Sequence, residues 1–527
     1  MGTPLRHCGS PEISGCLFGP PEFRLAPFCT SRYAACVSST RSKDSVLRPI
    51  DRMVSLFTHV LPGEGGQAAL LMVAVFLLLT TYYILKVVRE PLILAGGGAE
   101  IKSYTSAAQA AVLLVLIPLY SAFANRVDRM RLIAGVSLFF SANLVLFYLA
   151  ARAGVPLLGV VFFVWVGIFN LMMIAQFWSL ANDVYTPEQG TRLFAIVAFG
   201  QTMGAISGGV VARTLIGWCG VYPLMLVAAG LLGAYVAVVA WVHHRAAGGA
   251  TWNEPCCQSD RTDAPHEATK TPGASTDTLS PDESFDRRGG FSLIFHDRYL
   301  LLIGLFLVVL NFVNTNGEYI LGKVVSLEAV RSASALAAGS VVFASHVRRY
   351  IGAFYADFFT WVNISTAIIQ LLFVSRVMCK LGMRVALLVL PVVALGAYGL
   401  LAFVPVLALI RVAKIGENAL DYSLNNTARQ ALFLPTSRAA KFKAKAAVDT
   451  VFVRAGDLLS AMLVFASGAL AWRVRDFALV NIVLAVVWIA LVVAVAKRYI
   501  RRVATASRPA ARDVSQTGNS LPAGETS

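Results

Sequence analysis

Residues Leu409–Gly456 read LIRVAKIGENALDYSLNNTARQALFLPTSRAAKFKAKAAVDTVFVRAG. The first half of this stretch has almost wholly apolar neighbours, yet it carries Lys414, Glu417, Asp421, Asn425 and Arg429. At about 100° per residue, these five residues lie within roughly 120° of one another on one helix face. An ionisable residue in a membrane helix costs on the order of 2.5–3.5 kcal/mol and usually faces a bundle interior. If the segment crosses a bilayer, this polar stripe is the leading candidate for a functional site.

The composition indicates that the segment does cross a bilayer. Hydrophobic residues make up 57% of the chain and charged residues 14%, and the mean hydropathy is +0.67. Soluble proteins have about 25% charged residues. By the bilayer-length criterion we expect an all-α polytopic membrane protein with about twelve transmembrane helices in two six-helix halves. The expected spans are residues 67–88, 104–124, 132–152, 156–180, 193–216, 221–243, 299–321, 353–377, 385–408, 411–434, 446–471 and 477–496.

The polar run at 245–298 divides six expected spans from six others. It contains several Pro, Ser, Thr and Asp residues, which is typical of a flexible linker. Two parallel halves around such a linker are typical of transporters, whose site lies between the halves near the midplane. The expected organisation is a disordered extension at 1–66, a bundle at 67–244, the linker, a second bundle at 299–497 and a tail at 498–527. Translation could also begin at Met53. The apolar run 335–345 is too short to span, and we expect a re-entrant or interfacial piece there.

The basic residues indicate the orientation of the protein. The net charge is +16, and most basic residues of the connections fall on one side of a twelve-span layout. The positive-inside rule then places both termini and the linker in the cytoplasm. Lys323, Arg331, Arg348 and Arg349 are exceptions on the opposite side. This distribution accounts for the surplus charge, so we expect membrane lipid and no nucleic acid as a partner.

Motifs of enzymes and metal sites are missing from the sequence. None of the eight cysteines has the spacing of a metal site. We find no nucleophile–base constellation and no phosphate-binding glycine loop. Gly200, Gly204 and Gly208 recur at intervals of four, which predicts a face for close helix packing. We therefore expect no enzyme activity, no cofactor and no metal.

The first expected span ends in TTYYILKVVREPLIL, residues 80–94. Lys86 and Arg89 share a helix face there, and Glu90 lies next to it. These charges are candidates for a site, although long side chains at a helix end can also extend to the lipid headgroups. Pro91 predicts a break in the helix or just beyond it.

Two further spans carry polar residues. Span four contains Asn170, whose amide could contact substrate or hydrogen-bond a neighbouring helix, a contribution averaging about 0.6 kcal/mol. Span seven reads LNFVNTNGEYILGK, in which Asn311, Asn314 and Glu318 fall on one helix face. Glu318 is a candidate functional carboxylate because it lies in line with these polar groups.

At residues 421–457 the sequence DYSLNNTARQALFLPTSRAAKFKAKAAVDTVFVRAGD resembles the signature of the ATP/ADP translocases of obligate intracellular bacteria and plastids. The matching features are Tyr422 with Ser423, Leu434 with Pro435, the run Lys443 to Lys445, and Asp449. The segments YYILKVVREPLIL and FWSLAND also resemble that family, and the NRVDRMR loop with Asp128 resembles a loop of the major facilitator superfamily. The resemblance implies a twelve-span relative of the major facilitator fold that moves nucleotides. We expect a multi-pass protein of the bacterial inner membrane.

Four positions bear on the substrate. By motif alignment, Arg89 replaces the family's first-span Lys, and Val166 and Asn314 replace its two intramembrane Glu residues. Asp421 stands where the family has a Lys before the Tyr-Ser pair. One charge is therefore kept, two are lost and one is reversed, which leaves the substrate open.

Three functions remain. The first is a secondary transporter of nucleotides or a related anionic solute, in which basic residues hold the anion and carboxylates set coupling. The second is a proton-coupled carrier of a non-nucleotide metabolite, and the third is a non-transporting sensor or assembly protein. The oligomeric state is left open. The candidate substrate-binding residues are Lys86, Arg89, Asn170, Asn311, Asn314, Lys414, Asn425 and Arg429, and the candidate coupling or ion-pair residues are Glu90, Glu318, Glu417, Asp421 and Asp449.

Overall fold

The computed structural model describes residues 65–124, 129–185, 187–248, 290–436 and 444–506, and within these ranges every regular element is a helix. The predicted extension up to residue 64, the centre of the linker and the end of the tail lie outside the described residues. Asp128 and Lys443 also lie outside them.

The first half begins with one long helix that contains two spans. Its elements are α3 (Gly65–Ala124), α4 (Arg129–Ala153), α5 (Leu158–Val184), α6 (Pro187–Cys219) and α7 (Leu224–Gly248). The chain turns within α3 at Gly98, whose φ of 73° is left-handed and favours glycine. We call this turn the elbow. The predicted break at Pro91 was wrong, because the helix continues through Pro91 and its non-helical residue is Gly98.

The described part of the second half contains three short π-helical turns. Its elements are α8 (Gly290–His296), α9 (Arg298–Ser332), α10 (Val341–Ile369), η1 (Gln370–Val374), α11 (Ser375–Lys380), α12 (Gly382–Phe403), α13 (Leu407–Leu420), η2 (Asp421–Asn425), α14 (Asn426–Ala431), α15 (Lys445–Ala447), η4 (Val448–Phe452), α16 (Val453–Ala469) and α17 (Val474–Ala506). The apolar run 335–345 forms a turn that leads into the first residues of α10. A π-helical turn carries i→i+5 hydrogen bonds and often marks a functional site.

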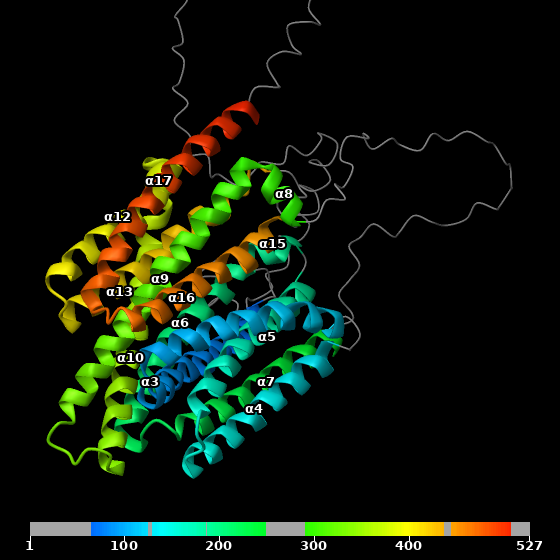
Figure 1. The fold of residues 1–527 in the computed structure, drawn as a ribbon. Helices are drawn as coiled ribbons and strands as arrows, with labels where there is room; N and C mark the ends of the chain where they lie inside the picture. The colour runs from blue at the N-terminus through cyan, green and yellow to red at the C-terminus, as the bar shows by residue number, and fades with distance from the viewer. Residues whose placement is uncertain (1–64, 125–128, 186, 249–289, 437–443, 507–527) are drawn as a thin grey trace, which may run out of the picture.

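The helices support the expected twelve spans. Ten described helical segments are long and apolar enough to cross a membrane. One of them, Gly65–Ile117, holds the first two spans on either side of the elbow. The segment from Leu407 to Ala431 forms a further span, although its charged residues lower its hydropathy. The prediction of about twelve helices in two halves is confirmed, and Figure 1 shows the first half, blue to green, beside the second, green to red.

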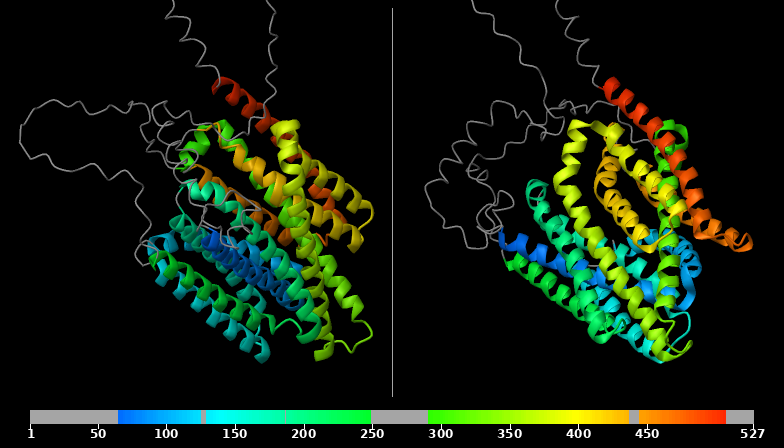
Figure 2. Two further views of the ribbon diagram at one scale, coloured as in Figure 1. Left: turned by 180° about the vertical axis from the view of Figure 1, so that it is seen from behind. Right: turned by 90° about the vertical axis from the view of Figure 1, so that its left-hand side faces the viewer.

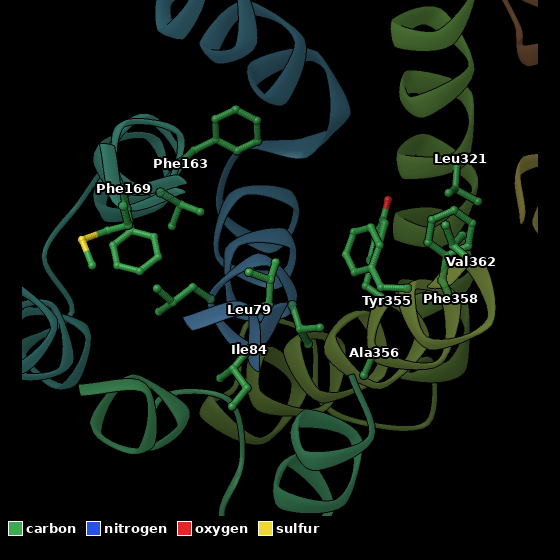
Figure 3. Close-up of a cluster of buried hydrophobic side chains, with 14 of the residues drawn as sticks. Leu79, Ile84, Phe163, Phe169, Leu321, Tyr355, Ala356, Phe358 and Val362 are labelled. Atoms are coloured by element: carbon green, nitrogen blue, oxygen red, sulfur yellow. The ribbon is translucent and has the colours of Figure 1, made fainter. Parts of the chain in front are cut away.

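Each half packs around its first long helix. In the first half α3 contacts α5, α6 and α7, and in the second half α9 contacts α16 and α17. The halves meet where α10 packs on α6 and α3, and where α16 packs on α3 (Figure 2). Figure 3 shows the apolar layers on both sides of α3, with Phe163 and Phe169 on one side and Tyr355 and Phe358 on the other.

The two ends of the bundle differ in their connections. Successive helices cross the bundle in opposite directions. The elbow, Gly220 and the turn at 333–340 therefore lie at one end of the bundle, which we call the elbow end. Gly248 and Gly290, which border the linker, lie at the opposite end, which we call the linker end. The last residue of α17, Ala506, also lies at the linker end.

The predicted glycine face of α6 packs directly against α3. A Cβ at Gly200 would lie 2.7 Å from the carbonyl oxygen of Met72, and one at Gly208 would lie 2.7 Å from that of Thr80. The Thr80 hydroxyl also donates a hydrogen bond to the carbonyl oxygen of Gly204, at 3.2 Å. The packing interpretation of these glycines is confirmed, and it explains how the two helices approach so closely.

Replacement of Gly208 by Ala should destabilise the bundle. The added methyl group would overlap the backbone of α3, and overpacking of this kind costs about 1–3 kcal/mol. Gly217→Ala in the same helix is the matched control, because a Cβ there meets nothing within 4 Å. Thermal unfolding in detergent should give a lower midpoint for Gly208→Ala alone. Equal midpoints for the two variants would contradict the close packing of α6 on α3.

Candidate functional site

A cavity of about 190 Å³ lies between the two halves, next to the elbow of α3. Both arms of α3 form its wall, together with α5 from the first half and α9, α10, α13 and η2 from the second. The lining residues are Lys86, Arg89, Ala99, Lys102, Ser103, Ser106, Gln109, Phe163, Asn314, Thr315, Glu318, Tyr319, Phe359, Asn418 and Tyr422. Three of them are basic and one is acidic, so the wall favours an anion.

Glu90 lies behind this wall and pairs with two of the basic residues. Its Oε1 accepts hydrogen bonds from Nε and Nη2 of Arg89, and its Oε2 lies 2.7 Å from Nζ of Lys102. Glu90 is 1% exposed. Lys102 reaches it only because the chain folds back at Gly98. The three charges therefore tie the two arms of α3 together across the elbow.

Lys414 is a second buried base, which lies behind the wall formed by the second half. Its Nζ donates a hydrogen bond to Oδ1 of Asn314 at 2.9 Å and lies 3.1 Å from Oε2 of Glu417. The hydroxyl of Tyr398 donates to the same Glu417 oxygen at 3.0 Å. Gly317 makes room for this group, because a Cβ there would meet the Tyr398 hydroxyl and lie 3.0 Å from Lys414 Nζ.

Glu318 connects the two halves at the centre of the site. Its Oε2 lies 3.9 Å from Nζ of Lys102 in the first half, and its Oε1 lies 3.8 Å from Nζ of Lys414 in the second. Asn418 donates a hydrogen bond to Oε1 at 3.2 Å. Because both ion pairs are long, the carboxylate is shared between two lysines and is bound tightly by neither.

Lys86 differs from the other bases of the site. Within the described residues, no carboxylate lies at ion-pair distance from its ammonium group, which instead faces three aromatic rings. The Nζ atom lies 4.2 Å from the ring centre of Phe359, 5.4 Å from that of Tyr83 and 6.0 Å from that of Tyr422. Cation–π contacts of this length stabilise a cation without neutralising it. Lys86 therefore keeps a charge that a ligand can use.

The charges of the site do not cancel. The lining residues and their ion-pair partners include four bases and three carboxylates, an excess of one positive charge. Lys86 supplies that excess. Interactions between charges are stronger in such a partly buried site than in water, so the excess favours binding of an anion.

Several polar groups at the site have no protein partner. The Ser103 hydroxyl and the Gln109 side-chain oxygen are buried without a hydrogen bond, and both residues line the cavity. The Tyr355 hydroxyl is also unpaired, and Lys102 lies 5.3 Å from the ring centre of Tyr355. Figure 3 shows Tyr355 on the opposite side of α3 from Phe163. Because unpaired buried polar groups are costly, Ser103 and Gln109, which line the cavity, are candidates to hydrogen-bond a ligand.

The structure brings seven of the sequence candidates together. Lys86, Arg89, Asn314 and Glu318 line the cavity. Glu90, Lys414 and Glu417 lie directly behind it as ion-pair partners. No metal-binding group of three or more His, Cys, Asp or Glu residues occurs in the described part of the chain.

The remaining candidates lie away from the cavity wall. Asn170 has a buried oxygen without a hydrogen bond, and Asn311 donates to the carbonyl oxygen of Leu307 in its own helix. The Asp421 carboxylate accepts a hydrogen bond from Asn425 at 2.7 Å.

Two candidates lie nearer the linker end. Arg429 donates to Asn426 at 3.3 Å and lies within electrostatic range of Asp449 and Asp421. The predicted single stripe is therefore divided. Asn418 and Tyr422 face the cavity where Asp421 was expected, and the π-helical turn that begins at Asp421 changes the helical phase beyond it.

The most important residue that sequence reasoning missed is Lys102. It falls in the expected connection between spans one and two, and its neighbours in sequence gave no sign of a membrane site. The run Gly96–Gly98 was the available signal, because three glycines predict a turn that could bring Lys102 back to Glu90.

Glu90→Gln should destabilise the protein. It would leave Arg89 and Lys102 without their shared carboxylate, and breaking a buried ion pair costs about 3–5 kcal/mol. The matched control is Glu328→Gln, because the exposed pair of Glu328 with Arg331 contributes about 0–1 kcal/mol. Thermal unfolding should distinguish the two variants, and restoration of stability by adding Lys102→Met would identify the unpaired charge as the cause. Equal stability of both single variants would disprove the role of Glu90.

Comparison with known proteins agrees with this architecture. The family model of the Major Facilitator Superfamily matches residues 70–436. "ADP,ATP carrier protein 2" of Chlamydia pneumoniae is 24% identical over 374 residues, which span 64% of this chain and 65% of the relative's length.

Two solved structures share the fold. The nucleoside transporter NupG matches with a TM-score of 0.54 and 13% identity, covering 82% of this chain and 98% of that one. A bacterial homolog of the human lysosomal transporter Spinster, in an inward-facing and unoccupied conformation, matches with a TM-score of 0.52 and 15% identity, covering 84% of this chain and 99% of that one. The chain therefore belongs to the Major Facilitator Superfamily and is a multi-pass membrane protein.

Proposed function

We propose that this transporter carries a nucleotide or a related phosphorylated anion through the central cavity by alternating access of its two halves. The observation that carries the proposal is the ammonium group of Lys86, which has no carboxylate at ion-pair distance among the described residues and lines the cavity with Arg89 and Lys102. Fixed cations of this kind offset the cost of bringing phosphate charge into a membrane.

The aromatic lining supports a ligand with a flat ring. Phe163, Phe359 and Tyr422 line the cavity beside the cations, and the Arg89 guanidinium lies 4.3 Å from the ring centre of Phe163. Such rings can stack on a base while the cations hold its phosphates. The name of the Chlamydia pneumoniae relative points to the same class of substrate.

The cavity volume bears on how the substrate enters. Ligand pockets usually measure about 300–1,000 Å³, whereas this one measures about 190 Å³. A whole nucleotide would therefore need the halves to separate. Contacts between the halves toward the elbow end, such as Glu100 with Lys323 at 2.8 Å and Arg213 with Asp357 at 3.2 Å, support opening at the linker end.

The orientation in the membrane is part of this proposal. The distribution of basic residues supports a cytoplasmic linker end, with both termini in the cytoplasm. On that orientation, the arrangement of the two halves corresponds to an inward-facing state. The proposed bundles are residues 67–244 and 299–497, which would move against each other around Glu318.

A second candidate function is a proton-coupled carrier of a non-nucleotide anion. Glu318 favours it, because this carboxylate lines the cavity, is shared by two lysines at 3.8 and 3.9 Å, and has a side chain that is 26% exposed. A carboxylate in this position can take up a proton when an anion displaces it from the lysines.

Purified protein in liposomes should exchange labelled nucleotide for internal nucleotide, and Lys86→Gln should reduce this uptake at least tenfold. The expected loss corresponds to about 1.4 kcal/mol of binding free energy, a modest value for a charge-assisted contact. Lys380→Gln is the matched control, because Lys380 is exposed at the end of α11. If no nucleotide of a panel is taken up while other solutes are, the nucleotide assignment is wrong. Unchanged uptake by Lys86→Gln would exclude the proposed anion site.

Uptake driven by a pH gradient should distinguish the two candidate functions. If the transporter exchanges nucleotides, uptake by the unaltered protein should not respond to the pH gradient, and uptake by Glu318→Gln should not respond to it either. If it is proton-coupled, the unaltered protein should accumulate solute in response to the gradient, and Glu318→Gln should lose this accumulation. Measurements of one labelled solute at two pH values, with and without internal solute, provide both comparisons.

A further inference from the structure

Basic residues at the elbow end fall into two groups. Two of the four that were exceptions to the positive-inside pattern have carboxylate partners. Lys323 lies 2.8 Å from Glu100, and Arg331 lies 3.1 Å from Glu328. Their charges are locally balanced, so they need no further explanation.

The other two exceptions, Arg348 and Arg349, meet a third arginine at a separate cavity. This cavity of about 170 Å³ is lined by Arg152 of α4 and by both α10 arginines, together with Tyr148 and Tyr222. No acidic residue lines it, and none of the three arginines has a carboxylate at ion-pair distance within the described ranges. We call it the arginine pocket.

The arginine pocket is shaped around these side chains. The Arg348 guanidinium lies 5.4 Å from the ring centre of Tyr222. Gly220 has a φ of +83°, and a Cβ there would lie 3.8 Å from Nε and 3.9 Å from Nη2 of Arg349. The Arg349 guanidinium therefore lies beside the connection between α6 and α7 at Gly220. Two of the three arginines are therefore positioned by contacts with the opposite half.

Three guanidinium groups around one cavity form a local excess of positive charge, which an anion between them would offset. Arginine pairs with phosphate oxygens through two parallel hydrogen bonds, which a carboxylate-free pocket leaves available. A phosphate group carries the charge and the acceptor oxygens needed to satisfy more than one guanidinium at once.

We propose that the arginine pocket binds a phosphate group and that this binding holds the two halves together at the elbow end. Arg152 and Tyr222 come from the first half, whereas Arg348 and Arg349 come from the second. A ligand that bridges them favours the conformation in which the elbow end is closed, since separation of the halves would divide its site. The pocket is distinct from the central cavity, so the inference does not depend on which solute is transported.

The phosphate could belong to a phospholipid or to a soluble compound. A neighbouring cavity of about 450 Å³ shares Tyr222 and Arg348 with the arginine pocket and is lined mainly by apolar residues, among them Ile93, Leu157 and Val160. A phosphate headgroup in the arginine pocket could therefore extend its apolar part into that space. The experiment below separates the two sources.

Cys219 provides a direct probe, because it is exposed and lines the arginine pocket. In the full chain with its other seven cysteines replaced by Ser, the rate of Cys219 modification by a neutral maleimide would be measured in four media. These are phosphate-free detergent, the same detergent with pyrophosphate, vesicles of phosphatidylcholine, whose choline neutralises its phosphate, and the same vesicles with anionic phosphatidylglycerol. We expect at least fivefold slower modification when a phosphate ligand occupies the pocket, compared with sulfate-free, phosphate-free detergent or with pure phosphatidylcholine.

The double variant Arg348→Gln/Arg349→Gln should lose the protection of Cys219 from modification. Arg331→Gln, the matched control at the same end of the bundle, should retain it. Thermal unfolding of each variant in detergent checks that the protein is folded. Protection by pyrophosphate as well as by phosphatidylglycerol supports a soluble phosphate ligand, and protection by phosphatidylglycerol alone supports a lipid. Absence of protection in both media, or protection that survives the double substitution, would overturn the proposal.

Discussion

The burial of charge inside a membrane bundle is the constraint on which the central site depends. Removing a charged group from water costs several kcal/mol, so a buried charge there needs a stabilising partner. Glu90 is 1% exposed and pairs with Arg89 beside it and with Lys102 from the other arm of α3. Lys414, equally buried, pairs with Glu417. These charges are thus held by oppositely charged partners, whereas aromatic rings stabilise Lys86.

This arrangement of charges requires close approach of backbones. The chain reverses direction at the elbow, at Gly98. This reversal brings Lys102 of the second arm of α3 to Glu90 of the first arm. Gly208 of α6 lets that helix lie against α3 at Thr80, and Gly317 leaves space for Tyr398 and Lys414. Each of these positions is one where an added Cβ would strain the backbone or displace a charged or backbone group. The small residues of the bundle therefore serve the site as well as the packing.

Two features of the site connect structure with transport. The halves are joined across the cavity by Glu318, whose carboxylate is shared by Lys102 and Lys414 at nearly equal distances. Lys86 contributes a charge that the aromatic rings stabilise without neutralising. In the proposed function, an anion that enters would bind Lys86 and compete with Glu318 for the two lysines, so occupancy of the cavity would change the contact between the halves. This coupling is what an alternating-access transporter requires.

The sequence by itself determined the class of protein, the twelve spans and the family relationship, because span length, helical periodicity and an ordered signature are local properties. It also identified Lys86, Arg89, Asn314 and Glu318, which line the cavity. Only the tertiary structure decided which polar residues face one another. Lys102 reaches the site through the fold of the elbow. The π-helical turn at Asp421 and the packing of the neighbouring helices place Asn418 and Tyr422, and not the whole predicted stripe, at the cavity. Helical phase and inter-helix contact depend on the whole bundle, which is why periodicity within one segment could not predict them.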